Sequence, residues 1–308
     1  MSRRFCVVVA LFLCFTGTGA AGAQVDSARA PADTAITHML RLRDGSTLMG
    51  RLLSRDSVSV TFATNGGVLT IPLTRVAEIK AVTAGDMHDD EYWFPDPNRT
   101  RMFFAPTGRM LERGEGYYSN TYLLLQNFVG GVSDHFTFGG GFSLVPGTDF
   151  LTNNAYYLTP KFGVFNSPTT NVAVGALVGF APFDNGHSFG ILYGVATRGG
   201  PDANLTGGLG YGFADGHVTS RPILMFGGQT RVSRRTALLT ENYVYWSTED
   251  QCTGTTTCQI VSRTKASGVL SYGVRFMGEK LSADLAFWNS STEFVFPGIP
   301  YIAFAVKF

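Results

Sequence analysis

Large apolar residues alternate with small or polar residues along most of the chain after residue 100. The runs are about ten residues long and end at turn signals. Residues 136–144 read Phe-Thr-Phe-Gly-Gly-Gly-Phe-Ser-Leu, and residues 188–195 read Ser-Phe-Gly-Ile-Leu-Tyr-Gly-Val. A period of two is that of β-strands with two different faces. One face is so rich in Gly that a second sheet would have little to pack against. The pattern therefore favours a closed antiparallel barrel with lipid outside and a narrow lumen inside over a two-layer sandwich.

The runs predict a barrel of about twelve strands over residues 101–308, an even number that is typical of bacterial transmembrane barrels. The predicted strands lie near residues 101–107, 117–130, 134–145, 154–164, 170–182, 187–198, 202–213, 217–230, 236–247, 261–276, 279–288 and 299–308. With both ends of the barrel on one side, the connections after even-numbered strands should be short turns, as at 131–133 and 199–201. The connections after odd-numbered strands should be longer external loops, as at 108–116, 248–260 and 289–298, although 183–186 and 214–216 are short.

The last eight residues, Tyr-Ile-Ala-Phe-Ala-Val-Lys-Phe, alternate up to the terminal position. This ending resembles the C-terminal signal of bacterial outer-membrane proteins, with Tyr301, Phe304 and Phe308 as the signal residues. Residues 104–109 and 140–147 also look like segments of uncharacterised, porin-like outer-membrane barrels, over roughly residues 100–308. The resemblance implies outer-membrane lipid and the barrel assembly machinery as partners. It implies no substrate, and the oligomeric state stays open.

The first 23 residues have the pattern of a secretory signal peptide. Arg3 and Arg4 precede the apolar residues 5–15, which are too few to span a bilayer, and residues 21–23 read Ala-Gly-Ala, a small-x-small cleavage pattern. An uncleaved anchor is the alternative. A lipoprotein is rejected, because Cys14 lies inside the apolar run and follows a bulky Leu. Residues 24–37 are small and polar and are expected to form a flexible tether.

Residues 38–82 read as a small β domain of about five strands. Turn signals at Asp44-Gly45 and Asn65-Gly66-Gly67 separate short alternating runs. The arrangement looks like an SH3-like or Sm-like barrel, which implies a peptide or RNA ligand. Because a signal peptide precedes the unit, we expect it in the periplasm, where RNA is implausible. A peptide or cell-wall contact and a plain structural appendage both remain open.

The composition supports a barrel and excludes several classes of function. The 308 residues carry a net charge of +1, which gives no electrostatic case for nucleic acid. Charged residues make up 15%, against an average of about 25% in globular proteins, and Gly numbers 37. No run of about 18 apolar residues follows the signal, so no transmembrane helix is expected.

Charged residues at positions of inward parity form a predicted lumen cluster. Its members are Lys161, Arg221, Glu241, Arg263, Lys265, Arg275 and Asp284. Such charges either pair across the lumen and fill it or line a polar pore. In both cases they should matter for folding.

Other candidate sites are weaker. Cys252 and Cys258, which have five residues between them in the polar run 248–259, predict a loop disulfide in an oxidising compartment, with a metal site as the alternative. The linker 83–100 contains Asp86, His88, Asp89, Asp90 and Glu91, which either bind a cation or form a solvated charge run beside an aromatic anchor.

An enzyme at the external rim would need a Ser–His pair, for which His187 with Ser188 and His217 with Ser220 are candidates. No Gly-x-Ser-x-Gly motif accompanies them, so we expect no catalytic residue, metal or cofactor. The preferred hypothesis is a narrow pore, or a transport or structural barrel for small or apolar molecules. The alternatives are a lipid-modifying rim enzyme and a barrel that anchors the small domain.

Overall fold

The computed structural model describes residues 37–82, 86–88, 91–183, 186–253, 259–292 and 294–308, and divides into two compact units between Thr83 and Ala84. The predicted signal peptide, nearly all of the tether and the side chains of the Cys252–Cys258 pair lie outside the described residues. Within the described ranges, no helix has the length and apolar character needed to cross a membrane.

The first unit is a five-stranded antiparallel sheet in the order β4-β3-β2-β1-β5. Its strands are β1 (Thr37–Leu42), β2 (Thr47–Arg55), β3 (Ser59–Thr64), β4 (Gly67–Pro72) and β5 (Val76–Val82), with a 3-10 turn over Leu73–Arg75. Alternate residues of these strands build the core, which includes Leu40, Val60, Phe62, Ile71 and Val76. Connections separate these strands at Asp44-Gly45 and at Asn65-Gly66, where the sequence has its turn signals, and likeness to an SH3-like barrel stays a prediction.

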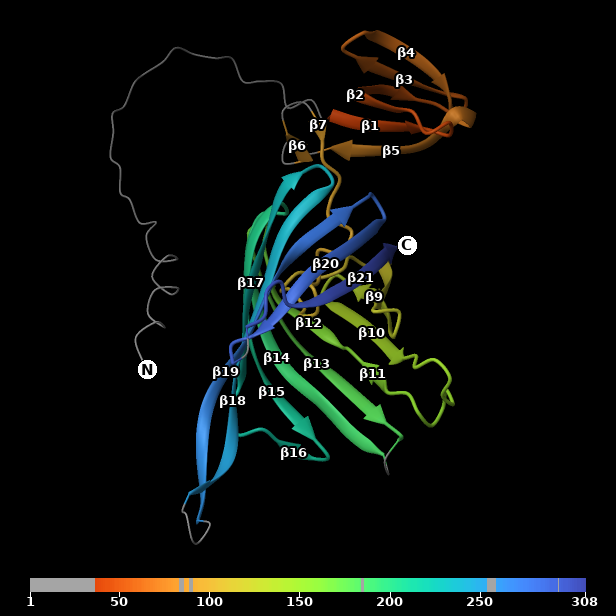
Figure 1. Ribbon diagram of the computed structural model, residues 1–308. Coiled ribbons are helices and arrows are strands. Elements are labelled where there is room, and N and C mark those ends of the chain that lie inside the picture. The colour runs from red at the N-terminus through yellow and green to blue at the C-terminus, as the bar shows by residue number, and fades with distance from the viewer. Residues whose placement is uncertain (1–36, 83–85, 89–90, 184–185, 254–258, 293) are drawn as a thin grey trace, which may run out of the picture. The chain divides into compact units, whose positions relative to one another are not determined.

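The second unit contains a closed antiparallel barrel (Figure 1). Its elements are β8 (Gly116–Thr121), β9 (Leu125–Ser133), β10 (Phe136–Ser143), β11 (Tyr156–Leu158), β12 (Lys161–Asn166), β13 (Thr170–Ala181), β14 (His187–Gly199), β15 (Ala203–Ala214), β16 (His217–Val218), β17 (Ile223–Ser233), β18 (Thr236–Thr253), β19 (Gln259–Met277), β20 (Leu281–Ser290) and β21 (Ile299–Lys307). Among the described residues these elements fill 12 strand positions, because β11 with β12 and β16 with β17 each share one. β21 pairs with β8 and closes the barrel. The predicted fold class is confirmed for the barrel.

The two ends of the barrel differ. Short connections such as 134–135 and 234–235 lie at one end, together with Gly116 and Phe308, and we call this end the turn rim. Residues 122–124, 144–155 and 215–216 connect strands at the opposite end, the loop rim. β18 and β19 are the longest strands and extend beyond their neighbours at the loop rim (Figure 1).

The first part of the predicted strand order is wrong. Residues 101–107 form no barrel strand but lie inside the lumen, and the predicted external loop 108–116 is the chain that returns from there. The predicted single strand 117–130 is instead two strands, β8 and β9, joined at residues 122–124. The two errors offset each other, so the predicted count agrees with the 12 positions found in the described residues.

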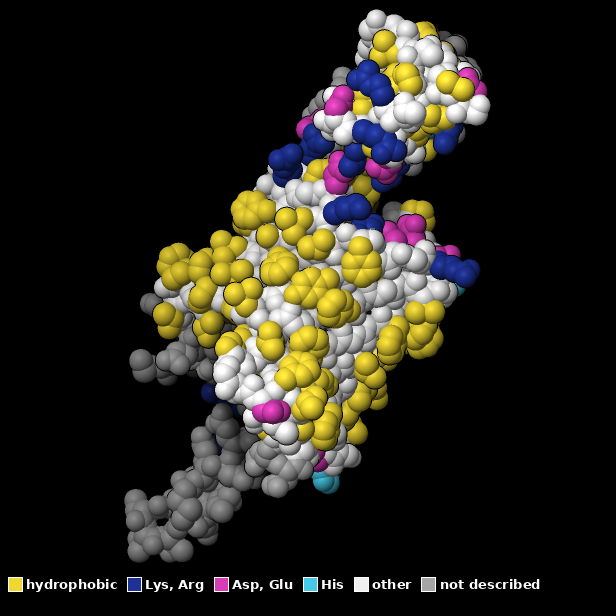
Figure 2. Space-filling view, turned by 90° about the vertical axis from the view of Figure 1, so that its right-hand side faces the viewer, with side chains coloured by type: hydrophobic (Ala, Val, Ile, Leu, Met, Phe, Trp, Pro, Cys, Tyr) yellow, Lys and Arg dark blue, Asp and Glu magenta, His cyan; other side chains and the backbone are white. Residues whose placement is uncertain are grey.

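Large apolar side chains cover the outer face of the barrel wall. Leu192, Leu209, Phe226 and Ile302 are each more than half exposed, and Figure 2 shows apolar side chains spread over the visible wall. On the inner face small residues make room for large ones, since a Cβ at Gly175 would lie 2.4 Å from the Tyr193 hydroxyl. An apolar outer band over a crowded interior is what a barrel presents to a bilayer.

Candidate functional site

Residues 93–115, which we call the inner segment, form a hairpin inside the lumen. The segment turns over residues 102–105, where Met102 N–H donates to the Ala105 carbonyl at 2.8 Å. On entry Phe94 accepts a hydrogen bond from Arg231, and on return Arg113 N–H donates to Asp134, both at the turn rim. Since Met102 and Phe103 are almost fully buried, the segment occupies the lumen and does not lie on its surface.

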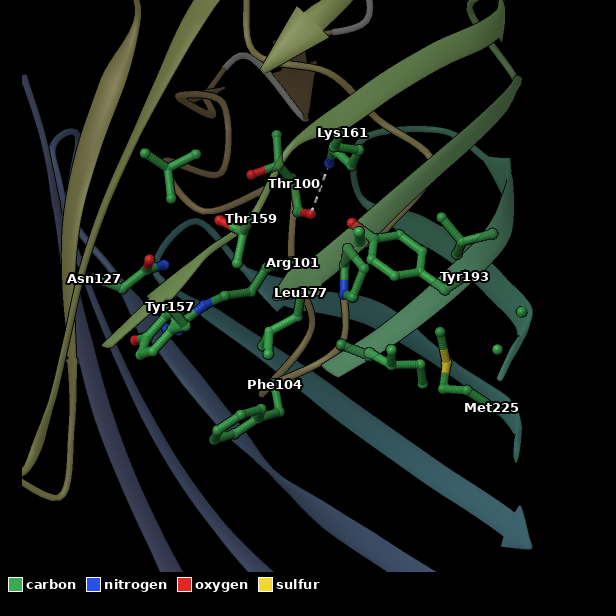
Figure 3. Close-up of a pocket in the computed structure, with 18 of the residues that line it drawn as sticks. Thr100, Arg101, Phe104, Asn127, Tyr157, Thr159, Lys161, Leu177, Tyr193 and Met225 are labelled. Carbon is green, nitrogen blue, oxygen red and sulfur yellow. Dashed lines mark hydrogen bonds between the residues drawn. The ribbon is translucent and has the colours of Figure 1, made fainter. Parts of the chain in front are cut away.

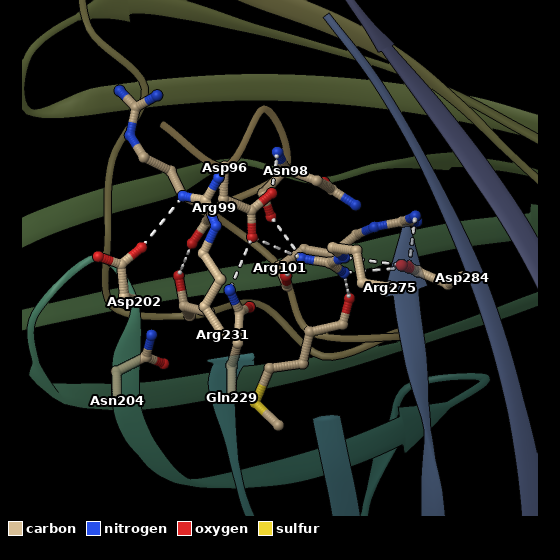
Figure 4. A network of polar contacts seen from close by, with 12 residues as sticks. Asp96, Asn98, Arg99, Arg101, Asp202, Asn204, Gln229, Arg231, Arg275 and Asp284 are labelled. Atoms are coloured by element: carbon tan, nitrogen blue, oxygen red, sulfur yellow. Dashed lines mark hydrogen bonds and ion pairs between the residues drawn. The ribbon is translucent and has the colours of Figure 1, made fainter. Parts of the chain in front are cut away.

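The backbone of the inner segment is not part of any sheet, so its polar groups need partners from the wall. Arg275 of β19 supplies donors for three of its carbonyls (Figure 4). Its guanidinium binds Asp284 of β20 through two hydrogen bonds, at 2.7 and 3.0 Å, and Asp96 at 3.1 Å. The remaining donor capacity goes to the carbonyls of residues 98, 101 and 102, at 3.2, 3.3 and 2.7 Å. A fully buried cation therefore joins two carboxylates and three carbonyls at one point.

Other wall strands hold the turn of the inner segment. Glu241 of β18 accepts hydrogen bonds from the N–H groups of Phe104 and Ala105 at 3.0 and 3.1 Å. Tyr301 of β21 donates to the Phe103 carbonyl at 2.7 Å. These contacts come from the side of the barrel that also carries Arg275.

The returning arm is held from the opposite side of the barrel. Lys161 of β12 donates to the carbonyls of Thr100, Thr107 and Arg109, the last at 2.7 Å. The Thr197 hydroxyl accepts from Gly108 N–H at 2.8 Å, and a Cβ at Gly108 would lie only 2.2 Å from the backbone of β13. The inner segment is thus fixed from strands around the whole wall.

The structure brings four of the seven predicted lumen charges to the inner segment: Lys161, Glu241, Arg275 and Asp284. The other three lie outside this cluster and are exposed. Arg263 and Lys265 are on the part of β19 that extends beyond the loop rim, and Arg221 precedes β17. Inward parity alone did not show that these positions are beyond the enclosed lumen.

Sequence reasoning missed two polar partners in this network. Asp96, which was assigned to the linker, is 3% exposed and accepts from Gln229 of β17 at 3.0 Å as well as from Arg275. Arg231, which lies just beyond the predicted strand 217–230, is buried on β17 and also binds Asp202. The inward parity of Gln229 was the available signal, but its partner could not be inferred without the position of the inner segment.

A pocket of about 450 Å³ lies on the loop-rim side of the inner segment (Figure 3). Its lining reaches from the turn of the inner segment to Thr121 and Leu125, next to the loop rim. The walls are mainly apolar and include Phe104, Leu177, Phe189, Ile191, Ile223 and Met225, together with Tyr157, Tyr193 and Tyr243. A concave, mostly apolar site with a few polar groups is the usual form of a small-molecule site.

Several polar atoms at this pocket are buried without a hydrogen-bond partner in the described part of the chain. They are Nε and Nη2 of Arg101, Oγ1 of Thr137, Oδ1 of Asn127 and Oγ1 of Thr100. Arg101 has only a long contact of Nη1 with Ser119, at 3.4 Å, and lies 3.9 Å from Asp284. Figure 3 shows its side chain extending toward Tyr157.

The candidate enzyme residues lie at the loop rim. His187 Nδ1 is 2.7 Å from the Asp215 carboxylate, and Ser188 contributes its backbone N–H, not its hydroxyl, to the same carboxylate at 2.9 Å. This arrangement links the ends of β14 and β15. His217 begins β16, and Ser220 follows that element. The expectation of no catalytic residue stays a prediction.

The linker residues for which a cation site and a solvated charge run were both open have other partners where the structure describes them. His88 binds Asp202 at 3.1 Å and stacks on Trp93, whereas Glu91 binds Arg234 at 3.4 Å. Asp89 and Asp90 lie outside the described residues. Within the described ranges, no group of three or more His, Cys, Asp or Glu side chains is placed to hold a metal ion.

The three predicted assembly-signal residues have different surroundings. Tyr301 faces the lumen and is 2% exposed, Phe304 packs against Tyr118 of β8, and Phe308 is largely exposed. Phe308 N–H also donates to the Gly116 carbonyl at 2.9 Å, which joins the two ends of the barrel chain. Recognition by the assembly machinery stays a prediction.

Glu115 should give the barrel a distinct acid sensitivity. Burial would raise the pKa of Glu115, but hydrogen bonds from Arg99 and Lys307 outweigh it and lower the pKa from 4.5 to about 2. Because the folded-state pKa is depressed, the stabilisation is present above pH 4.5 and is lost as the pH falls toward 2.

Glu115→Gln should therefore reduce the free energy of unfolding by about 1–3 kcal/mol near neutral pH, and the difference from the wild type should vanish at low pH. The check is urea unfolding of both proteins across this pH range. A difference that does not depend on pH would contradict the prediction. Glu112→Gln is the control, because Glu112 lies 3.6 Å from Arg99 and its side chain is 78% exposed.

No family model and no curated protein sequence matches the chain. Among solved structures it is similar to the KdgM porin in complex with disordered oligogalacturonate, at 6% identity and a TM-score of 0.39, over 63% of this chain and 95% of that chain. It is also similar to the NanC porin, at 10% identity and a TM-score of 0.38, over 63% and 96%. OmpT, an outer-membrane protein of Vibrio cholerae, matches at 11% identity and a TM-score of 0.35, over 89% and 95%. All three scores are low, so the barrel fold of this chain rests on its own strand pairing.

Proposed function

We propose that this chain is a bacterial outer-membrane barrel that binds a small, mainly apolar molecule in its lumen and transports it, with the small unit in the periplasm. The apolar outer band, the predicted signal peptide and the C-terminal strand support the membrane location. The barrel is a binding barrel and not a permanently open pore.

One observation carries the proposal: a mainly apolar pocket lies directly against an inner segment that is tied to strands on every side. A pore for hydrated ions would need a continuous polar passage. Here the passage is interrupted by buried side chains and backbone. The pocket has room for about 15 non-hydrogen atoms at about 30 Å³ each, which suits a molecule with a chain of about ten carbons.

Filling the pocket should abolish binding of an apolar probe. Ile191 lines the pocket, whereas Leu192, the next residue of β14, faces outward and is 56% exposed. We expect Ile191→Trp to reduce the affinity for radiolabelled decanol by about tenfold or more, and Leu192→Trp to leave it unchanged.

The measurement is equilibrium dialysis against the barrel in lipid nanodiscs, with empty nanodiscs to subtract partitioning into lipid. Saturable binding of one decanol per barrel supports the proposal. If wild-type nanodiscs bind no more decanol than empty ones, or if both Trp variants behave alike, the lumen pocket is not the site.

A further inference from the structure

We infer that the ligand of the lumen pocket is an amphipathic anion, whose carboxylate or similar head group binds Arg101 while its apolar body lies against Phe104, Leu177 and Ile191. The inference rests on the proposed function, since it names the chemical class of the molecule bound in that pocket.

The guanidinium of Arg101 is buried with few hydrogen-bond acceptors in the part of the chain that the structure describes. It is about nine-tenths buried at the pocket, and its Nε and Nη2 atoms have no hydrogen-bond acceptor among the described residues. A buried charge without hydrogen-bond partners is costly. The planar fork of an Arg side chain matches a carboxylate, which can accept two parallel hydrogen bonds. Because Arg101 lines the pocket, an anionic head group bound there would supply acceptors that the guanidinium lacks.

The neighbouring carboxylates already accept hydrogen bonds from other residues, so they do not neutralise Arg101 at short range. Asp284 accepts both of its short hydrogen bonds from Arg275, and Asp96 accepts from Arg275 and Gln229. Asp284 is 3.9 Å from Nη2 of Arg101, which is too long for a hydrogen bond. The existing anions are thus satisfied elsewhere.

The other charged residues near the pocket also favour a negatively charged ligand. Lys161 also lines the pocket, is 5% exposed and makes its hydrogen bonds to three backbone carbonyls. Glu241 does not line the pocket, and it already accepts hydrogen bonds from three residues that do, Phe104, Ala105 and Tyr243. Two cations, Arg101 and Lys161, therefore line the pocket without a short contact to a carboxylate. The carboxylate nearest to Arg101, that of Asp284, already accepts two hydrogen bonds from Arg275.

The apolar lining indicates that the rest of the ligand, beyond its head group, is apolar. Apart from the cations, the side chains that face the pocket are mostly aliphatic or aromatic. Apart from Arg101, the unpartnered polar atoms among the described lining residues are those of Thr100, Asn127 and Thr137, which are too few for the hydroxyl groups of a sugar acid. An unbranched or ring-bearing apolar body has no polar group that would need a hydrogen-bond partner. The two halves of the lining therefore fit one amphipathic molecule.

The test compares three probes that share one chain and differ in head-group charge: decanoate, decanol and decyltrimethylammonium. Each is dialysed at mildly alkaline pH against wild-type barrel in zwitterionic lipid nanodiscs, with empty nanodiscs as the blank. We expect the affinity to fall in the order decanoate, decanol, decyltrimethylammonium. Equal affinity for decanoate and decyltrimethylammonium overturns the inference.

Variants then assign the charge preference to one residue. Arg101→Met should weaken decanoate binding by about tenfold or more and change decanol binding by less than about threefold, whereas Arg101→Lys should retain part of the preference. Arg221→Met removes the same charge from an exposed position and should have no effect.

Each outcome is decisive. Equal loss of decanoate and decanol in Arg101→Met, or an equal effect of Arg221→Met, overturns the inference. If Arg101→Met fails to fold, as judged by loss of the heat-modifiable band, the wild-type ranking of the three probes decides. Binding of decanol without any charge preference leaves the proposed function standing and removes only the inference, whereas binding of none of the probes removes both.

Discussion

Arg275→Met should lower the free energy of unfolding by about 3–5 kcal/mol, the range for breaking a buried ion pair by removing one partner. Arg275 is fully buried and is the group through which Asp284, Asp96 and three carbonyls of the inner segment are satisfied. Methionine keeps much of the side-chain volume but leaves two carboxylates close together without their cation. The cost arises from these stranded charges and not from a cavity.

The measurement is urea unfolding in phospholipid vesicles, followed by tryptophan fluorescence and by heat-modifiable migration in gels. Trp288 is a useful reporter because its ring lies 5.8 Å from that of Tyr301, near the turn of the inner segment. Arg221→Met is the matched control and should change stability by less than about 0.5 kcal/mol. A loss below about 1 kcal/mol in Arg275→Met would mean that water reaches the two carboxylates.

Replacing residues 97–110 by a short Gly-Ser linker should convert a silent barrel into a conducting one. These residues carry most of the contacts that cross the lumen, including those to Glu241 and Lys161. Both ends of the replaced stretch lie on chain that leads to the turn rim, so a short linker can join them without strain on the wall. In planar bilayers we expect step-like conductance from the variant and none from the wild type.

The control is deletion of residues 38–82, which removes a stretch of chain from the separate first unit and leaves the inner segment intact. This protein should stay silent. Conductance of the wild type equal to that of the variant would show that the inner segment does not close the lumen. Conductance after deletion of the small unit would assign closure to that unit instead.

Most of the barrel wall could be predicted because its two faces meet different surroundings. In β14, for example, Ile191 and Tyr193 face the pocket while Leu192 faces outward, so the period of two is visible in the sequence. The same parity placed Arg275 and Glu241 on the lumen side, where both are buried. The pairing of Arg275 with Asp96 could not be predicted, because it depends on where the inner segment lies.

The turn between β8 and β9 was missed for a local reason. Tyr122 and Leu123 have positive φ angles of 56° and 62°, a conformation that usually calls for Gly, Asn or Asp. Side chains on either side supply the support, since Asn120 accepts from Leu123 N–H at 2.8 Å and Gln126 donates to the Leu123 carbonyl at 3.0 Å. Because these turn residues include no Gly or Pro, the sequence pattern predicts one continuous strand over 117–130.

The inner segment resembles a barrel strand in sequence for a different reason. Met102, Phe103 and Ala105 are apolar residues buried in the lumen. Together with their polar neighbours they give the mixed apolar and polar pattern that is typical of a strand. A single sequence does not distinguish an apolar residue that faces lipid from one that faces the interior of a filled barrel. Only the position of the segment, inside the wall, separates the two.

The inner segment enters and leaves through the same rim, and this has a topological consequence. The chain makes a loop that does not thread the barrel, so no terminus has to pass through the lumen either to install the segment or to withdraw it. The hydrogen-bonded ring from β8 to β21 is complete without it. The strand pairing of the wall therefore involves no residue of the inner segment, so a different segment in its place would leave the order of the strands unchanged.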